Sequence, residues 1–161
     1  MQWFCDLPYN HKVFVAGNHD MCMYGADKVE GLPDDVHYFC NSGIDIDGIK
    51  FYGMPMFMEY AMDGTYEQHI KDIPDDTDVL VTHQTPYGIL DGGEYKGQAS
   101  YHYGDYFLYT RVIDVKPKLH LFGHDHNAYG SIEQFGTAFS NAAVVDEHYK
   151  LKEIKYLTYK I

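Results

Sequence analysis

The sequence is poor in cysteine and in basic residues. Its three cysteines, Cys5, Cys22 and Cys40, are an odd number without a C-x-x-C pair, which argues against both a structural zinc site and a secreted disulfide framework. Lys and Arg number 12 against 24 Asp and Glu, which gives a net charge of −12 at pH 7. This balance excludes nonspecific binding to nucleic acid or to anionic membranes. From the cysteines we expect reduced thiols and a cytoplasmic location.

Long apolar runs and phosphate-binding glycine loops are also absent. No stretch reaches the length of a transmembrane helix, and the first residues lack the basic region and apolar run of a signal peptide. The glycine-rich segment Asp91–Gly97 does not follow a strand and open a helix, so we predict a loop there. A soluble protein without a membrane partner is expected.

The composition that remains is that of one folded domain. With 161 residues, of which 45% are hydrophobic and 16% aromatic, the chain can bury a core. It has no internal repeat and no low-complexity linker, so residues 1–161 are predicted to form a single domain.

Three short apolar runs, each followed by potential metal ligands, organise the chain. Lys12–Ala16, Asp78–Thr82 and Leu119–Phe122 predict buried strands of one largely parallel sheet. Because such strands place the residues that follow them at one edge of the sheet, we expect those side chains to converge. The nitrogens of His83 and His124 should then lie within about 5 Å of each other. The residues that follow the strands are Asn18, His19, Asp20, His83, His124 and His126.

The remaining segments predict helices, a hairpin and closing strands. Asp47-Gly48 predicts a tight hairpin turn, Asp105 the cap of a helix, and Gly123 a turn through a positive φ or a close backbone approach. The predicted helices are Met1–Leu7, Thr65–Ile73 and Asp105–Val115, and the closing antiparallel strands are Tyr129–Phe135, Thr137–Ser140 and Lys152–Lys160.

In this order, the three polar segments resemble those of the calcineurin-like metallophosphoesterases. The segments are Gly17-Asn18-His19-Asp20, Thr82-His83 and Gly123-His124-Asp125-His126. Thr82–Pro86, Pro117–His124, Tyr129-Gly130 and Ser140-Asn141 are similar to the corresponding segments of the small metallophosphoesterase-domain proteins. The resemblance implies an α/β fold, a β-sandwich flanked by helices in four α/β/β/α layers.

The resemblance also implies a metal centre and an activity. Two divalent ions, of manganese, iron, zinc or nickel with manganese favoured, would clamp a phosphodiester or phosphomonoester for hydrolysis. A nucleotide is one candidate substrate, with Tyr87, Tyr101 or Tyr103 available to stack on a base. By the same resemblance Asn18, His83 and His124 would ligate one ion and His126 the other. His19 would bind the phosphate or protonate the leaving group, and Asp20 would orient its ring.

The sequence departs from this family at its start. The family's Asp-x-His and Gly-Asp motifs, which supply the other ligands, do not occur before Gly17. We therefore expect the C-terminal portion of a larger domain, lacking its N-terminal strands and largely inactive alone. The alternatives are a non-catalytic remnant and one half of a two-chain enzyme, which would pair with a second chain or self-associate.

The other histidines have no partner motif. From its position before the capped helix, His102 is predicted to line the substrate cleft. The remaining five, expected to be structural, are His11, His37, His69, His120 and His148.

Overall fold

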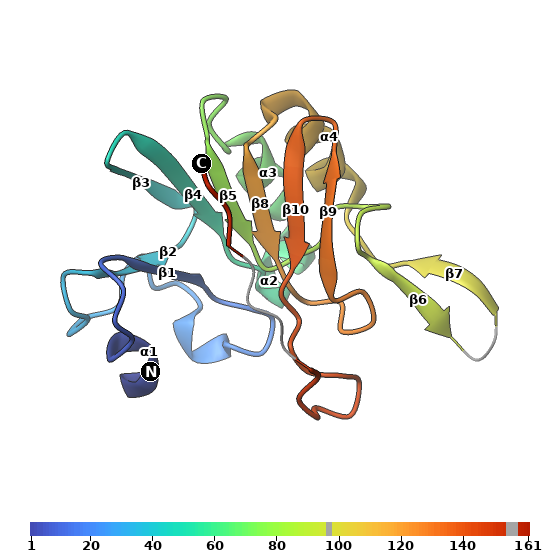
Figure 1. Ribbon diagram of the computed structural model, residues 1–161, viewed down its shortest axis with the longest axis horizontal. Coiled ribbons are helices and arrows are strands. Elements are labelled where there is room, and N and C mark those ends of the chain that lie inside the picture. The colour runs from blue at the N-terminus through green and yellow to red at the C-terminus, as the bar shows by residue number, and fades with distance from the viewer. Residues whose placement is uncertain (96–97, 154–157) are drawn as a thin grey trace.

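Six strands form one mixed sheet in the order β3-β4-β5-β8-β10-β9 (Figure 1). The computed structural model describes residues 1–95, 98–153 and 158–161. Strands β4, β5, β8 and β10 run parallel, while β3 and β9 pair antiparallel at the two edges. The expected parallel pairing of the strands before His83 and His124 is confirmed. The bounds are β3 Ser42–Ile46, β4 Ile49–Met54, β5 Val79–Thr82, β8 Leu119–Phe122, β9 Gly130–Gln134 and β10 Thr137–Asn141.

Helices cover one face of this sheet. In Figure 1, α3 and α4 lie behind the strands, and Asp105 caps α4 as expected, because its side chain accepts a 2.7 Å hydrogen bond from the Leu108 N–H. The helices are α2 Met58–Asp63, α3 Tyr66–Lys71 and α4 Tyr106–Val115. The core between sheet and helices consists of Tyr52, Met54, Ile70, Ile73, Leu80, Ile89, Leu108, Val112, Phe122 and Phe139. These contacts confirm the α/β class.

Strand β1 (Lys12–Val15) lies outside the six-stranded sheet, so the expected single sheet is wrong. It pairs in parallel with β2 (Val36–Phe39) in a sheet of two strands. Both edges of β5 and of β8 are already occupied, which leaves β1 no position between them. Instead the pair packs across the other face, where a Cβ at Gly53 would lie 2.3 Å from that of Phe39. The second layer of the sandwich therefore consists of these two strands within the described residues.

A hairpin replaces the glycine-rich loop expected after Asp91. Strands β6 (Gly92–Tyr95) and β7 (Gln98–His102) pair antiparallel, with Gly92 opposite His102, and project to the right in Figure 1. Cross-strand pairing is not a local property, so the glycine-rich composition did not reveal it.

The two ends of the chain add little regular structure. Residues 2–5 form α1 (Gln2–Cys5), shorter than expected, and Met21–Met23 forms a 3-10 turn.

Of the closing strands expected to be antiparallel, β10 is antiparallel to β9 but parallel to β8. The strand expected at Lys152–Lys160 lies partly outside the described residues, and its described ends are irregular. Across the described ranges, every helix is too short or too polar to cross a membrane.

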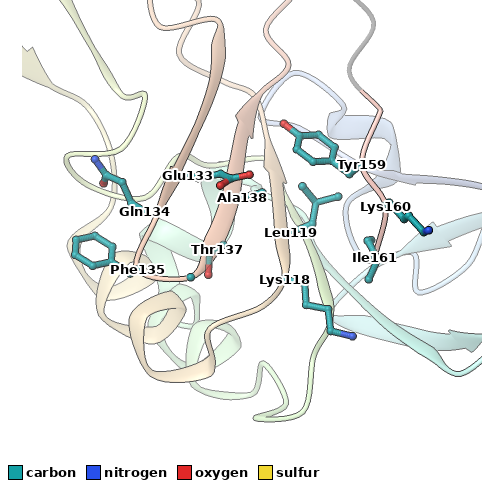
Figure 2. A pocket seen from close by; sticks show the side chains of 11 residues that line it. Lys118, Leu119, Glu133, Gln134, Phe135, Thr137, Ala138, Tyr159, Lys160 and Ile161 are labelled. Carbon is teal, nitrogen blue, oxygen red and sulfur yellow. The ribbon is translucent and has the colours of Figure 1, made fainter.

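The last residues border a surface cavity of about 520 Å³ on the face opposite the helices (Figure 2). Tyr159 and Ile161 lie on one side of it, and Leu119 and Ala138 form its floor. Its lining contains no histidine, so it has none of the predicted metal ligands.

Candidate metal centre

Three predicted ligands from distant segments converge at the carboxyl ends of β1, β5 and β8. The His83 Nε2 lies 2.9 Å from the Asn18 Oδ1 and 3.1 Å from the His124 Nδ1. The two imidazole rings meet edge to face, with centroids 5.0 Å apart. The nitrogen distance is well inside the 5 Å limit set from the sequence. Two sheets contribute to this cluster, because Asn18 follows β1 and the histidines follow strands of the main sheet.

Backbone hydrogen bonds hold the strand ends together. The His83 N–H donates to the Met54 carbonyl, and the Gly123 N–H donates to the His83 carbonyl, each at 3.2 Å. Gly17 lies directly against the His83 ring, since a Cβ at this position would be 2.5 Å from the ring Cε1. A glycine is thus required at the point where the β1 loop passes His83.

The left-handed residue at the second loop is His124 rather than Gly123. His124 has φ +66°, whereas a Cβ on Gly123 would meet nothing within 4 Å and Gly123 is not among the glycines with positive φ. The expectation that Gly123 turns the chain by a positive φ or a close approach is therefore wrong. A non-glycine residue in this conformation costs energy, and such strain is typical of functional sites.

The strain at His124 leads to a stability prediction. His124→Gly should be about 1 kcal/mol more stable than His124→Ala, because glycine adopts a positive φ without a Cβ clash. Both variants lack the imidazole, so metal-free urea unfolding isolates the backbone effect. Equal stabilities would contradict the strain at this position.

Both histidines of the cluster are held neutral. Burial, assisted by the neighbouring His124, lowers the pKa of His83 to about 4. Burial likewise lowers the pKa of His124. At neutral pH each ring therefore has one unprotonated nitrogen, the form that binds a metal ion.

The donor set fits a single divalent ion. Two donors that share an ion through bonds near 2.0–2.1 Å lie roughly 2.9–3.4 Å apart at neighbouring coordination positions. The observed separations of 2.9 and 3.1 Å fall in this range. Two imidazole nitrogens and an amide oxygen suit manganese, iron, nickel or zinc.

The imidazole of His126, predicted to ligate the other ion, is held by a backbone carbonyl. Its Nδ1 lies 3.0 Å from the Asp146 carbonyl, and because a carbonyl only accepts, Nδ1 carries the proton and Nε2 presents the lone pair. Among the described residues, however, no three His, Cys, Asp or Glu side chains cluster so as to hold a metal ion. Among the described residues, the site predicted for the other ion, at His126, is therefore poorer in ligands than the site at His83.

The loop that carries His124 and His126 is held by Asn141 at the end of β10. The buried Asn141 amide donates to the carbonyls of Leu90 and Asp125, at 2.9 and 3.0 Å. Its Oδ1 accepts from the Ala143 N–H. Asn141 thus positions the ligand loop, a role that the Ser140-Asn141 similarity alone did not specify.

The three other predicted site residues, His19, Asp20 and His102, lie outside the cluster of Asn18, His83 and His124. His19 is exposed and lines the same cavity as Asn18, whereas Asp20 accepts a 2.8 Å hydrogen bond from the Gly17 N–H. Orientation of the His19 ring by Asp20 stays a prediction. His102 is absent from the lining of this cavity and instead contacts the buried Asp91 at 2.8 Å.

The cavity above the cluster has a volume of about 370 Å³ and aromatic walls that the sequence did not single out as a pair. Tyr103 is fixed there, since its N–H donates to the Asp91 carbonyl and its carbonyl accepts from Gln84. Tyr149 lies in a loop and places its ring edge-on to His126 at 5.7 Å. No sequence pattern marks Tyr149, because its position depends on where the loop after β10 folds back. The lining consists of Asn18, His19, His83, Tyr103, His124, Asp125, His126, Asn127, Glu147 and Tyr149.

Comparison with known proteins gives consistent matches. Residues 1–128 match the family model for calcineurin-like phosphoesterases. The chain is 32% identical to UPF0046 protein K07C11.7 of Caenorhabditis elegans, over 85% of this chain and 53% of that protein. It is 28% identical to metallophosphoesterase domain-containing protein 1 of Homo sapiens, over 92% of this chain and 55% of that protein. The chain thus spans about half the length of these curated relatives.

A solved crystal structure also has the same fold. It matches with a TM-score of 0.52 and 14% sequence identity, over 80% of this chain and 56% of that one. At this identity the match concerns the fold alone.

Proposed function

We propose that this chain, which belongs to the calcineurin-like phosphoesterase family, forms the part of a metal-dependent phosphoesterase centre that holds one divalent ion. The observation that carries the proposal is the convergence of Asn18, His83 and His124, with 2.9 and 3.1 Å between their donor atoms. The reaction class is hydrolysis of a phosphodiester or phosphomonoester. Manganese is the favoured metal, and a cytoplasmic location remains part of the proposal.

Each residue has a distinct task in this proposal. Asn18, His83 and His124 would hold the ion, and His126 would contribute to a second. When bound, the ions neutralise phosphate charge and activate water for attack. His19, exposed in the same cavity, would donate a proton to the leaving oxygen.

The aromatic walls favour a substrate that carries a flat ring. Tyr103 and Tyr149 line the cavity together with the ligand histidines. A ring attached to the phosphate could stack on either side chain while the ester lies over the histidines. We therefore propose a phosphate ester with an aromatic group, such as a nucleotide, as the substrate class.

A second candidate is a protein that binds one metal ion without catalysing hydrolysis. The lack of a carboxylate-rich cluster among the described residues favours it, because a two-metal mechanism needs ligands that hold both ions close together. This candidate and the proposed phosphoesterase centre, which needs further ligands from a second polypeptide, predict the same result for the chain alone. They differ once the missing motifs are supplied.

Activity measurements separate these candidates. In excess manganese, we expect the chain alone to hydrolyse phosphodiesters and phosphomonoesters with aromatic groups at a rate close to background. Addition of a polypeptide with the Asp-x-His and Gly-Asp motifs should restore hydrolysis, and His124→Ala should remove it again. His148→Ala, which changes an exposed histidine outside the cavity, is the matched control. Full activity of the chain alone would refute the incomplete centre, and inactivity in both conditions would favour the non-catalytic protein.

A further inference from the structure

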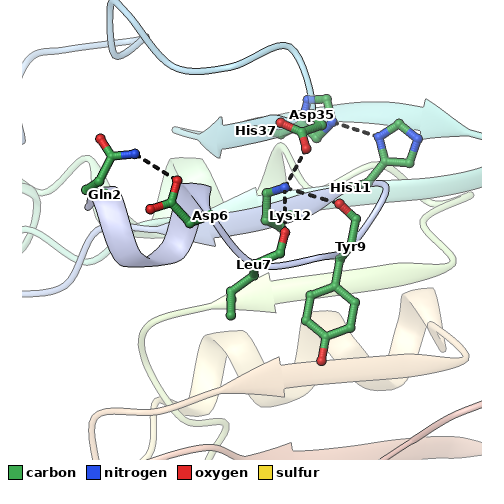
Figure 3. A network of polar contacts seen from close by, with 8 residues as sticks. All are labelled: Gln2, Asp6, Leu7, Tyr9, His11, Lys12, Asp35 and His37. Atoms are coloured by element: carbon green, nitrogen blue, oxygen red, sulfur yellow. Dashed lines mark hydrogen bonds and ion pairs between the residues drawn. The ribbon is translucent and has the colours of Figure 1, made fainter.

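A second pair of histidine nitrogens meets at the other end of β1. The His11 Nδ1 lies 3.1 Å from the His37 Nε2, as the dashed line between the rings in Figure 3 shows. The rings are nearly parallel, at 26°, with centroids 5.4 Å apart. His11 directly precedes β1, and His37 is the second residue of β2, opposite Val13. Strand pairing therefore brings together two histidines that are 26 residues apart in the sequence.

The backbone beneath this pair is anchored by a buried ammonium group. The side chain of Lys12 is 3% exposed and contacts the carbonyls of Leu7 and Tyr9 at 3.3 and 3.1 Å (Figure 3). The Lys12 ammonium also forms an ion pair with the Asp35 carboxylate. The backbone N–H of Lys12 donates to the backbone carbonyl of Asp35 at 2.8 Å. Lys12 and Asp35, which are close in sequence to His11 and His37, are thus tied to each other, which fixes the backbone that carries the two imidazoles.

We propose that His11 and His37 form a separate site for a late first-row transition-metal ion such as nickel, zinc or copper. Their separation of 3.1 Å lies in the range for two donors at neighbouring positions around one ion, roughly 2.9–3.4 Å for bonds near 2.0–2.1 Å. With the ring centroids 5.4 Å apart the two nitrogens face each other almost head-on, so the exposed His11 ring must rotate for both lone pairs to reach one ion. Two imidazoles prefer these ions to magnesium or calcium, which favour oxygen ligands. Water completes the coordination.

The protons and ligands balance in this binding step. In the metal-free pair, one of the two facing nitrogens carries the hydrogen that bridges them. When the ion binds, two metal–nitrogen bonds form and two water ligands leave. The bridging proton moves through solvent to the outer nitrogen of the same ring, so both rings remain neutral.

The electrostatic surroundings tolerate an added cation. Asp35 interacts with both rings, and its carboxylate is paired with the Lys12 ammonium, so this ion pair adds no net charge beside the site.

This site is independent of the candidate metal centre. The four residues of β1, roughly 13 Å of extended chain, separate His11 from the loop that carries Asn18. Occupancy would link β1 to β2 at the end opposite that loop. Because the sheet has only two strands, such a link should raise its resistance to unfolding.

Nickel titration of the whole chain by calorimetry tests the proposal. His124→Ala removes the candidate centre, and in this variant we expect one remaining nickel site and a nickel-dependent rise in the melting temperature. Adding His11→Ala or His37→Ala should abolish both signals, whereas adding His148→Ala should preserve them. Copper bound to the His124→Ala protein should show two nitrogen ligands by electron paramagnetic resonance. Nickel binding that survives His37→Ala in the His124→Ala protein, provided that circular dichroism shows a folded chain, would overturn the site.

Discussion

Replacing Gly17 with alanine is expected to lower the metal affinity of the candidate centre by about 10- to 100-fold, the range seen when the support of a ligand is disturbed. The added methyl group would lie 2.5 Å from the His83 Cε1 and 2.9 Å from its Nε2, the nitrogen that faces Asn18 and His124. Because the contact falls on a half-buried ring rather than on a flexible end, the ring or the β1 loop must shift. Either movement separates the three donors.

Gly123→Ala is the matched control for this substitution. Gly123 also precedes a ligand at a strand end, but a Cβ there would meet nothing within 4 Å. We therefore expect metal affinity close to that of the unaltered chain. Manganese binding measured for both variants decides the matter, and equal affinities would show that Gly17 does not position His83.

Acid should destabilise the protein through His120, by about 1.4 kcal/mol per pH unit below the ordinary histidine pKa of about 6.5. His120 is fully buried, and burial lowers its pKa to about 3. The unfolded chain therefore binds a proton that the folded chain excludes. The stabilisation is complete above the unfolded pKa and is lost progressively as the pH falls toward the folded value.

The contacts of His120 explain why its ring stays neutral. The Thr82 hydroxyl donates to the Gln84 carbonyl at 2.7 Å, so it can only accept from the His120 Nε2, which lies 2.9 Å away. The proton is thus on Nε2, and Nδ1 is buried with no hydrogen-bond partner in the described part of the chain. Protonating Nδ1 would create a buried charge that no neighbour compensates.

Urea unfolding at several pH values within this window tests the effect. His120→Gln keeps a donor toward Thr82 but cannot titrate, so its unfolding free energy should fall less steeply with acid than that of the unaltered chain. His148→Gln, at an exposed position, should leave the slope unchanged. Metal is removed throughout, so that metal binding does not affect the unfolding free energy. His83, whose pKa is also lowered, adds the same pH dependence to all three proteins. Parallel pH profiles for His120→Gln and the unaltered chain would refute the assignment.

Local sequence determined which residues can form the candidate centre. Short apolar runs predict strands, and the polar residues that follow them must lie at strand ends. This reasoning predicted that Asn18, His83 and His124 converge, and His83 Nε2 lies 2.9 Å from the Asn18 Oδ1 and 3.1 Å from the His124 Nδ1. The resemblance in these same segments also indicated the family that the match over residues 1–128 confirms.

Only the tertiary structure decided how the strands are shared between two sheets and what surrounds each ligand. Competition for the edges of β5 and β8 excluded β1 from the main sheet, and no local pattern records that competition. The contact of Gly17 with the His83 ring, the positive φ of His124 and the meeting of His11 with His37 each depend on segments far apart in the chain. Periodicity determines which face of a strand is apolar, whereas strand pairing depends on the burial that all segments achieve together.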